Sequence, residues 1–298
     1  FRSIRNAGTL TIANSLIQGN TTAGDGGGIL NNGVLTVVNS LVSGNAAADD
    51  GGGIADNGTA QLESVTIAGN RATDNGGGLF ITVDGETTAG NSIIDSNGAA
   101  DGNDIYITGT SAFLGNPGTL NARHVLYGQL DRTEILQITS GDFNDLGGNI
   151  QVNLAAESIF MMPQSASNAP TIMGDYRLVD GSPAYNAGNA NLLPNESTLG
   201  TDADGDGVDD DPISVDLRQA TRDRFEALDM GAYEAQADEV TRCYAEFFAV
   251  TGFGSIRFGF DASVVTDQNN PLQRIVREVD DNVNVNTDGT MRIAGSCI

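Results

Sequence analysis

Short apolar runs alternate with glycine, asparagine and aspartate in the first part of the chain, and the pattern returns every 25 residues. The run Thr9–Ile12 recurs as Val34–Val37, and a triple glycine step recurs at 26–28, 51–53 and 76–78. Short runs rich in β-branched residues between turn residues are typical of strands. No stretch has the sustained 3.6-residue apolar period of a helix. A fixed repeat of this length indicates a stacked architecture, in which each repeat buries a surface of its neighbour.

Three short strands in each repeat correspond to one coil of a parallel β-helix. We therefore predict an all-β chain, a right-handed, single-stranded parallel β-helix whose coils lie about 4.8 Å apart, the spacing of paired strands. We expect regular coils over residues 1–110 and larger, irregular coils over 111–190. The interval from Asn70 to Asn97 is slightly longer than the repeat, so a short insertion is expected near Asp84.

One asparagine in each coil keeps the register of the repeat. These residues are Asn20, Asn45, Asn70 and, after the insertion, Asn97. Stacked side-chain amides can form hydrogen bonds from one coil to the next, as in cross-β ladders. The alternative is that each asparagine only suits its own turn. The regular spacing favours a ladder, because a residue that serves only its own turn does not need it.

The sequence starts in register with the repeat, since residues 1–8 align with 26–33 and keep Ile4, Asn6 and Gly8. A β-helix that starts inside a coil leaves backbone donors and acceptors unpaired. Two explanations stay open. Either the chain is cut from a longer one, or a neighbouring molecule covers this end.

The charge of the chain is strongly acidic, with 39 Asp and Glu against 14 Arg and no Lys, a net charge of −25. Such a surface repels nucleic acid and anionic membranes and suits an ion-rich medium. No apolar run is long enough for a membrane-spanning helix. No signal peptide is visible, but because the sequence opens inside a repeat, this absence does not argue against a leader that has been removed.

The last third of the chain changes character. Residues 191–236 are polar, acidic and rich in turns, whereas 237–298 hold five of the eleven phenylalanines between Phe247 and Phe260. Cys243 and Cys297 bracket this tail. A disulfide between them would add about 3–4 kcal/mol by loop-closure estimates and would indicate an oxidising, exported setting; two free thiols are the alternative. We expect a small disulfide-closed β module over 237–298, with a bare hydrophobic cap on the solenoid as the alternative.

A loop at residues 202–210 reads D-x-D-x-D-G followed by further acids. Carboxylates at alternate positions, followed by a glycine that lets the loop turn, wrap oxygen ligands around a calcium ion. The predicted ligands are Asp202, Asp204 and Asp206 through their side chains, Val208 through its carbonyl, and Asp210 directly or through water. Ile213 takes the place of the bidentate glutamate of an EF-hand, so the site is not a standard one. The calcium would be structural; a solvated acidic turn is the alternative.

Three motifs occur in and around this region: GSPAYNAG at 181–188, DLR at 216–218 and LDMGAYE at 228–234. In this order they resemble the choice-of-anchor Q domain of bacterial secreted and surface proteins. The preceding NSxxxGNxxxxGGGI repeats resemble the coils of polymorphic outer-membrane and adhesin-like proteins. The resemblance covers residues 1–236, with Gln219 as a departure where a glycine is usual. It implies a secreted, extracellular or cell-surface location and a structural role.

The motif residues of this resemblance are Asp216, Arg218, Asp229, Tyr233 and Glu234. Among them, Asp216, Arg218 and Asp229 could form a charge-assisted network. We expect this network to clamp the end of the solenoid.

Parallel β-helices also host lyases and hydrolases that act on polysaccharides, so an enzyme is the alternative function. A glycosidase needs two carboxylates at a defined separation across one groove. A lyase of this type typically needs calcium and a basic side chain, but the chain has no lysine, and its one histidine, His124, lies in an apolar run.

We therefore predict a non-enzymatic extracellular protein with a structural or adhesive role. Its partners would be a surface or carbohydrate ligand, or other copies of itself. The start inside a coil and the phenylalanine-rich tail suggest a head-to-tail contact between copies. A head-to-tail contact that does not close generates a filament.

Overall fold

The computed structural model describes residues 2–111, 115–132, 138–139, 141–199, 212–222 and 228–235, together with four short strands further along the chain. The chain divides into two compact units, Phe1–Ala235 and Gln236–Ile298. In the second unit, β23 (Glu246–Phe247) pairs antiparallel with β24 (Phe258–Gly259), and β25 (Val283–Val285) with β26 (Met291–Ile293). Cys243 and Cys297 lie outside the described residues.

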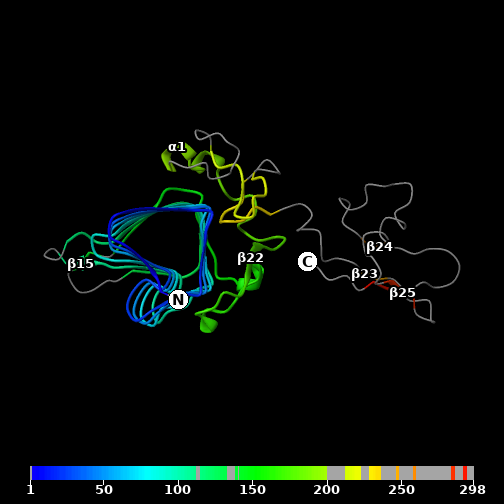
Figure 1. Cartoon of the computed structure of the whole chain (residues 1–298), viewed down its shortest axis with the longest axis horizontal. Coiled ribbons are helices and arrows are strands. Elements are labelled where there is room, and N and C mark those ends of the chain that lie inside the picture. The colour runs from blue at the N-terminus through cyan, green and yellow to red at the C-terminus, as the bar shows by residue number, and fades with distance from the viewer. Residues whose placement is uncertain are drawn as a thin grey trace. The chain divides into compact units, whose positions relative to one another are not determined.

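The first unit is a parallel β-helix of about five coils, so the predicted all-β fold is confirmed. Seen along the stack, successive coils superpose as a three-sided outline (Figure 1). One side is a parallel sheet of six strands: β1 (Ile4–Asn6), β5 (Ile29–Asn31), β9 (Ile54–Asp56), β12 (Leu79–Ile81), β14 (Ile105–Ile107) and β17 (Leu130–Arg132).

The second and third sides belong to one sheet, because β13 (Glu86–Ile94) and β16 (Thr119–Tyr127) run through the corner between them. The second side also holds β2 (Thr9–Ala13), β6 (Val34–Val38), β10 (Thr59–Glu63) and β19 (Asp142–Asp145). The third side also holds β3 (Leu16–Gln18), β7 (Leu41–Ser43), β11 (Thr66–Ala68) and β20 (Ile150–Gln151). Outside this triangle, β4 (Thr21–Thr22) pairs with β8 (Ala46–Ala47), and β15 (Thr110–Ser111) with β18 (Ile138–Thr139).

The strand register follows the sequence repeat and locates its insertion. The pairing of Asp56 with Ile81 still keeps the regular spacing of the repeat, whereas Thr59 pairs with Glu86, beyond the position that this spacing gives. The extra residues therefore lie between Ile81 and Glu86, around Asp84, as predicted from the sequence.

Aliphatic side chains that point inward fill the coils. Ile29, Ile54, Leu79 and Ile105 are fully buried and lie in register, one coil above another. Burying one such side chain contributes about 1.5–3 kcal/mol. Each coil therefore places an aliphatic side chain against the equivalent side chain of the neighbouring coil.

The triple glycine step allows neighbouring turns to approach closely. Gly51 has φ +66°, a left-handed conformation that glycine adopts at little steric cost. A Cβ on Gly52 would lie 2.3 Å from the carbonyl carbon of Arg71 and 2.4 Å from Gly77 O. The step thus tolerates no side chain at its centre.

The corner between the second and third sides carries one residue per coil with positive φ. These residues are Asn14, Asn39, Ser64, Asn91 and His124, with φ between 44° and 54°. Asparagine tolerates this conformation better than most residues. The column explains the Asn-Ser pairs at 14–15, 39–40 and 91–92.

The parallel stack ends earlier than the expected residue 190. After β20 the chain folds back along the third side as a flank, which we define as residues 153–199, 212–222 and 228–235. The flank contains η1 (Ala156–Ser158), η2 (Ala166–Asn168), η3 (Ala190–Leu192), α1 (Glu196–Leu199), and the antiparallel pair β21 (Phe160–Met162) and β22 (Asp175–Leu178).

Apolar packing explains why residues around 160 leave the stack. Outward-facing Leu41, Ile93 and Leu126 form a column on the third side, and the flank buries them under Phe160 and Tyr176. The two rings meet edge to face, 5.4 Å between centroids, an arrangement that stabilises aromatic pairs. Covering this column excludes water from it, which another coil at the end of the stack would not do.

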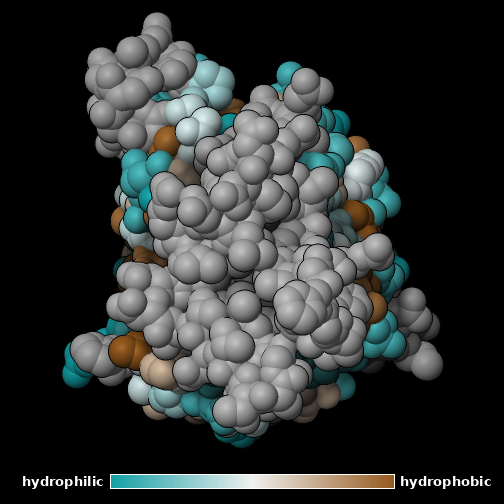
Figure 2. All heavy atoms as spheres, turned by 90° about the vertical axis from the view of Figure 1, so that its right-hand side faces the viewer, coloured by the Kyte–Doolittle hydropathy of each residue, from teal (hydrophilic) through white to brown (hydrophobic). Residues whose placement is uncertain are grey.

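In Figure 2, the coloured residues at the margins of the face shown are mostly hydrophilic, with apolar residues scattered between them. Within the described residues, no helix has the length and apolar character to cross a lipid bilayer.

Candidate functional site

The four repeat asparagines form a continuous ladder of side-chain amides. Nδ2 of Asn20 donates to Oδ1 of Asn45 at 3.0 Å, Asn45 to Asn70 at 2.9 Å, and Asn70 to Asn97 at 2.9 Å. The backbone N–H of each of these three donors also bonds the same oxygen at 3.0 Å. All the amides therefore point the same way along the stack.

The ladder ends on a carboxylate that was not among the predicted site residues. Asn97 donates to Oδ1 of Asp104 from its backbone N at 2.9 Å and from Nδ2 at 3.1 Å. The other oxygen of Asp104 accepts from Gln129 N at 2.8 Å. The available signal was the break in the glycine step, where Asp104 takes the place that Gly78 holds one coil earlier.

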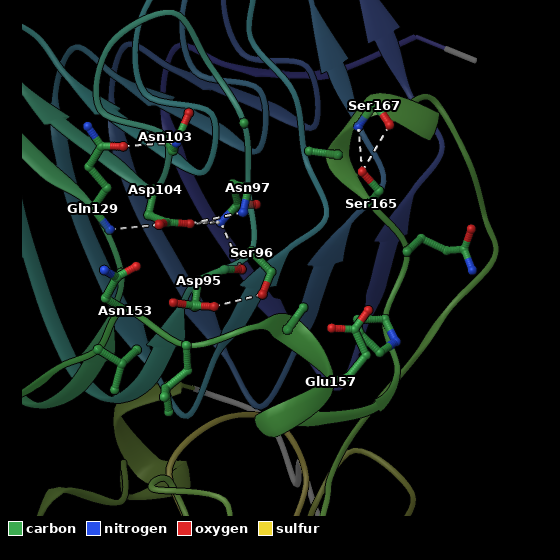
Figure 3. A pocket seen from close by; sticks show the side chains of 18 residues that line it. Asp95, Ser96, Asn97, Asn103, Asp104, Gln129, Asn153, Glu157, Ser165 and Ser167 are labelled. Carbon is green, nitrogen blue, oxygen red and sulfur yellow. Dashed lines mark hydrogen bonds between the residues drawn. The ribbon is translucent and has the colours of Figure 1, made fainter.

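A cavity of about 570 Å³ opens beside this end of the ladder, between the coil and the flank (Figure 3). Its coil wall comes from the turns of the β-helix, and its flank wall comes from the chain around η1 and η2. The charged and polar lining residues are Asp95, Ser96, Asn97, Asn103, Asp104, Gln129, Asn153, Glu157, Gln164, Ser165 and Ser167. Among the described residues that line the cavity, every charged side chain is acidic.

Asp95 follows β13 directly and faces the cavity with 5% of its surface exposed. Its Oδ1 accepts from Ser96 Oγ at 2.7 Å, while no described residue donates to its Oδ2. A Cβ on Gly128 would lie 2.6 Å from Asp95 Oδ2 and 2.3 Å from Asp104 Oδ2, so these two oxygens are at most about 5 Å apart. Two buried carboxylates therefore meet over a glycine.

The two carboxylates of this pair bind protons more tightly than ordinary aspartates do. Burial raises the pKa of Asp95 to about 6, against the opposing effect of the Ser96 hydrogen bond. Burial also raises the pKa of Asp104 to about 7; the negative charge of Asp95 raises it further, and hydrogen bonds from Asn97 and Gln129 oppose the rise. Both pKa values rise because a buried carboxylate has little solvent to stabilise its charged form, and no positive charge is present among the described residues that line the cavity.

The flank wall of the cavity offers hydroxyl and amide groups. Ser165 caps η2, and its Oγ lies 2.9 Å from Ser167 Oγ. Glu157 stands on η1, exposed at the rim. Figure 3 shows the serines across the cavity from Asp95 and Asp104. Donors and acceptors therefore face the carboxylate pair from the opposite side.

The five motif residues lie together in the flank. Arg218 Nη2 bonds Asp216 Oδ2 at 2.8 Å and Glu234 O at 2.7 Å, and its Cζ lies 5.6 Å from the Tyr233 ring centre. Asp229 accepts from the backbone N of Asn186 and of Ala235, both at 2.6 Å. Burial raises the pKa of Asp229 to about 6.

A buried arginine outside the predicted motif residues joins this network to the β-helix. Arg222 Nη2 donates to Asn39 Oδ1 at 2.6 Å, and Nη1 lies 3.6 Å from Glu234 Oε2. Burial raises the pKa of nearby Glu63 to about 8, with Arg222 opposing the rise. The network thus holds the flank against the corner column of Asn39, not against the end of the solenoid as expected. Arg222 and Asn39 are 183 residues apart in the sequence, and no local sequence pattern predicts such a contact.

His124, the one histidine of the chain, is not among the residues that line the cavity. His124 sits in the corner column, with Nδ1 2.9 Å from Ala187 O. The predicted calcium ligands Asp202, Asp204, Asp206, Val208 and Asp210 lie outside the described residues. In the part of the chain that the structure describes, no three His, Cys, Asp or Glu side chains are placed to hold a metal ion together.

No family model, curated protein or solved structure matches this chain.

Proposed function

We propose that this chain is a non-enzymatic extracellular protein with a structural or adhesive role, and that it holds a carbohydrate in the cavity between coil and flank. The observation that supports a carbohydrate ligand is the lining of that cavity, which combines carboxylates, amides and hydroxyls. Such groups, placed in a preformed concave site, are the ones that orient a polar ligand. The net charge of −25 suits an ion-rich medium, in which salt screens the self-repulsion of the chain.

Binding is favoured over hydrolysis by the engagement of Asp104. A glycosidase needs two carboxyl groups that can reach either side of one glycosidic bond. Oδ1 of Asp104 already accepts two hydrogen bonds from Asn97, and Oδ2 accepts one from Gln129. Asp104 is therefore held in place as the terminus of the ladder and is not free to act as a catalytic acid or nucleophile, although it also lines the cavity.

Two further parts of the proposal concern stiffness outside the cell. A structural calcium ion in the loop at 202–210 would order an acidic segment. A disulfide between Cys243 and Cys297 would close the C-terminal segment. Both would suit a protein that works without cellular repair.

The test is retention on polysaccharides combined with an assay for products. The full chain is incubated with insoluble neutral, acidic and amino polysaccharides, and both bound protein and released sugar are measured. We expect retention without released reducing or unsaturated sugar. Ser167→Trp at the exposed rim should abolish retention, whereas Thr88→Trp, exposed on the second side, should not. Release of sugar by the wild type would favour the enzyme instead.

A further inference from the structure

The charges that line the cavity restrict the kinds of ligand that it can bind. Asp95, Asp104 and Glu157 line it, and no arginine or histidine is among the described lining residues. Charged side chains are seldom buried without a partner, because desolvation of an unpaired charge is costly. Asp95 is buried, with only 5% of its surface exposed, and its Oδ2 accepts from no described residue. Oδ1 of Asp95 is bonded to Ser96, and its Oδ2 remains open to the cavity as a negatively charged acceptor.

The geometry selects a small cationic group with several donors. The Oδ2 atoms of Asp95 and Asp104 face the same space over Gly128, at most about 5 Å apart. One nitrogen with three N–H donors can reach both oxygens and still donate to a third acceptor. A calcium ion would instead need about six to eight oxygen ligands, and the described residues offer no cluster of three metal-ligating side chains.

The opposite wall indicates what the cation is attached to. Ser165 and Ser167 present hydroxyl groups across from the carboxylates, and the amide of Gln164 also lines the cavity. A volume of about 570 Å³ falls within the range of small-molecule sites. A ligand with an amine at one end and hydroxyls along its body matches both walls.

We propose that the cavity binds an amino sugar, with its ammonium group between Asp95 and Asp104 and its hydroxyls toward Ser165 and Ser167. This inference rests on the proposed carbohydrate-binding function and names the class of sugar. Asp95 is the specificity-determining residue, because its Oδ2 is the acceptor that no described residue occupies. Asp104 contributes charge while it terminates the ladder.

Calorimetric titration of the full chain with four probes tests the inference. Glucosamine carries amine and hydroxyls, N-acetylglucosamine and glucose lack the charge, and cadaverine lacks the hydroxyls. Hydrogen bonds to a charged group are worth more than neutral ones, so glucosamine should bind about tenfold or more tighter than N-acetylglucosamine. Asp95→Asn keeps the shape and should erase that difference. Glu86→Gln removes one exposed charge on the second side and should not change it.

Each outcome of the titration decides something. Equal affinity for charged and neutral sugars, unchanged in Asp95→Asn, would overturn the ammonium assignment and leave the proposed carbohydrate function standing. Binding of cadaverine alone would overturn the sugar. Calcium binding that is lost in Asp95→Asn would replace the ammonium with a metal. If Asp95→Asn fails to fold, Ser167→Trp, which blocks the rim, supplies the comparison and should abolish glucosamine binding.

Discussion

The amide ladder makes a quantitative prediction for the substitution Asn70→Ala. Asn70 is fully buried. Its Oδ1 accepts from the backbone N and Nδ2 of Asn45 at 3.0 and 2.9 Å, and its Nδ2 donates to Asn97 Oδ1 and Val42 O, both at 2.9 Å. Truncation removes these four bonds and a longer one from Nδ2 to Ala68 O at 3.3 Å.

The expected cost of Asn70→Ala follows from which groups keep a partner. Asn45 Nδ2 still donates to Ile17 O, but its backbone N–H loses its acceptor inside the stack. An orphaned buried donor costs about 1–3 kcal/mol and each further lost bond about 0.5–1.5 kcal/mol. We expect the free energy of unfolding to fall by about 4 kcal/mol, a large share of the roughly 5–15 kcal/mol of a typical domain.

Asn20→Ala is the matched control, because Asn20 occupies the same position at the start of the ladder. Its Nδ2 makes one side-chain bond, to Asn45 Oδ1, so we expect a loss of only about 1 kcal/mol. Urea unfolding followed by circular dichroism, with the slope held constant between variants, measures the difference. Equal destabilisation by the two substitutions would refute the ladder and favour an asparagine that serves only its own turn.

Three further predictions concern pH, packing and metal. The pKa of Glu63 in the folded state is about 8, against an ordinary value of 4.5, so the folded state binds this proton more tightly than the unfolded state does. Stability should therefore fall as pH rises from about 4.5 to 8. Thermal melts at a series of pH values should show this fall in the wild type and a flatter dependence of melting temperature on pH in Glu63→Gln. Gly33→Ala should impair folding because its Cβ would lie 2.2 Å from Gly8 O, whereas Gly8→Ala meets nothing within 4 Å and should leave the melting temperature almost unchanged; equal effects would contradict the packing argument. Chelation should lower the melting temperature, and Asp204→Ala with Asp206→Ala should abolish that response; an unchanged melt would reduce the loop to an acidic turn.

The repeated part of the molecule was predictable because it is repeated. Three copies of one spacing locate the strands, the glycine step and the ladder at once, and the longer interval between Asn70 and Asn97 locates the insertion. The repeats can be compared with one another, because a position whose side chain points inward in one coil must also point inward in the next. The position of Asn97 could be found only because Asn70 preceded it.

The flank escaped prediction because it occurs once. Antiparallel pairing of β21 with β22 has no second copy to reveal it, and the apolar run at 158–160 reads equally well as another coil. Arg222 contacts Asn39 across 183 residues, a contact that depends on the folded path of the whole chain. The cavity needs both the coil and the flank, so no local pattern indicates it.

The direction of the ladder explains why the cavity holds an acid at this place. In the ladder, each asparagine from Asn20 to Asn97 donates to the side-chain oxygen of the next position, so the last position must accept without donating in return. A carboxylate satisfies this requirement, whereas an asparagine at 104 would have to turn its Nδ2 toward either Asn97 or Gln129, both of which already donate. Asp104 is thus fixed by the polarity of the stack, and its second oxygen, which also accepts from Gln129 N, brings negative charge to the cavity beside Asp95. Asp104→Asn should therefore weaken the fold and the site together, while Asp95→Asn should alter only the site.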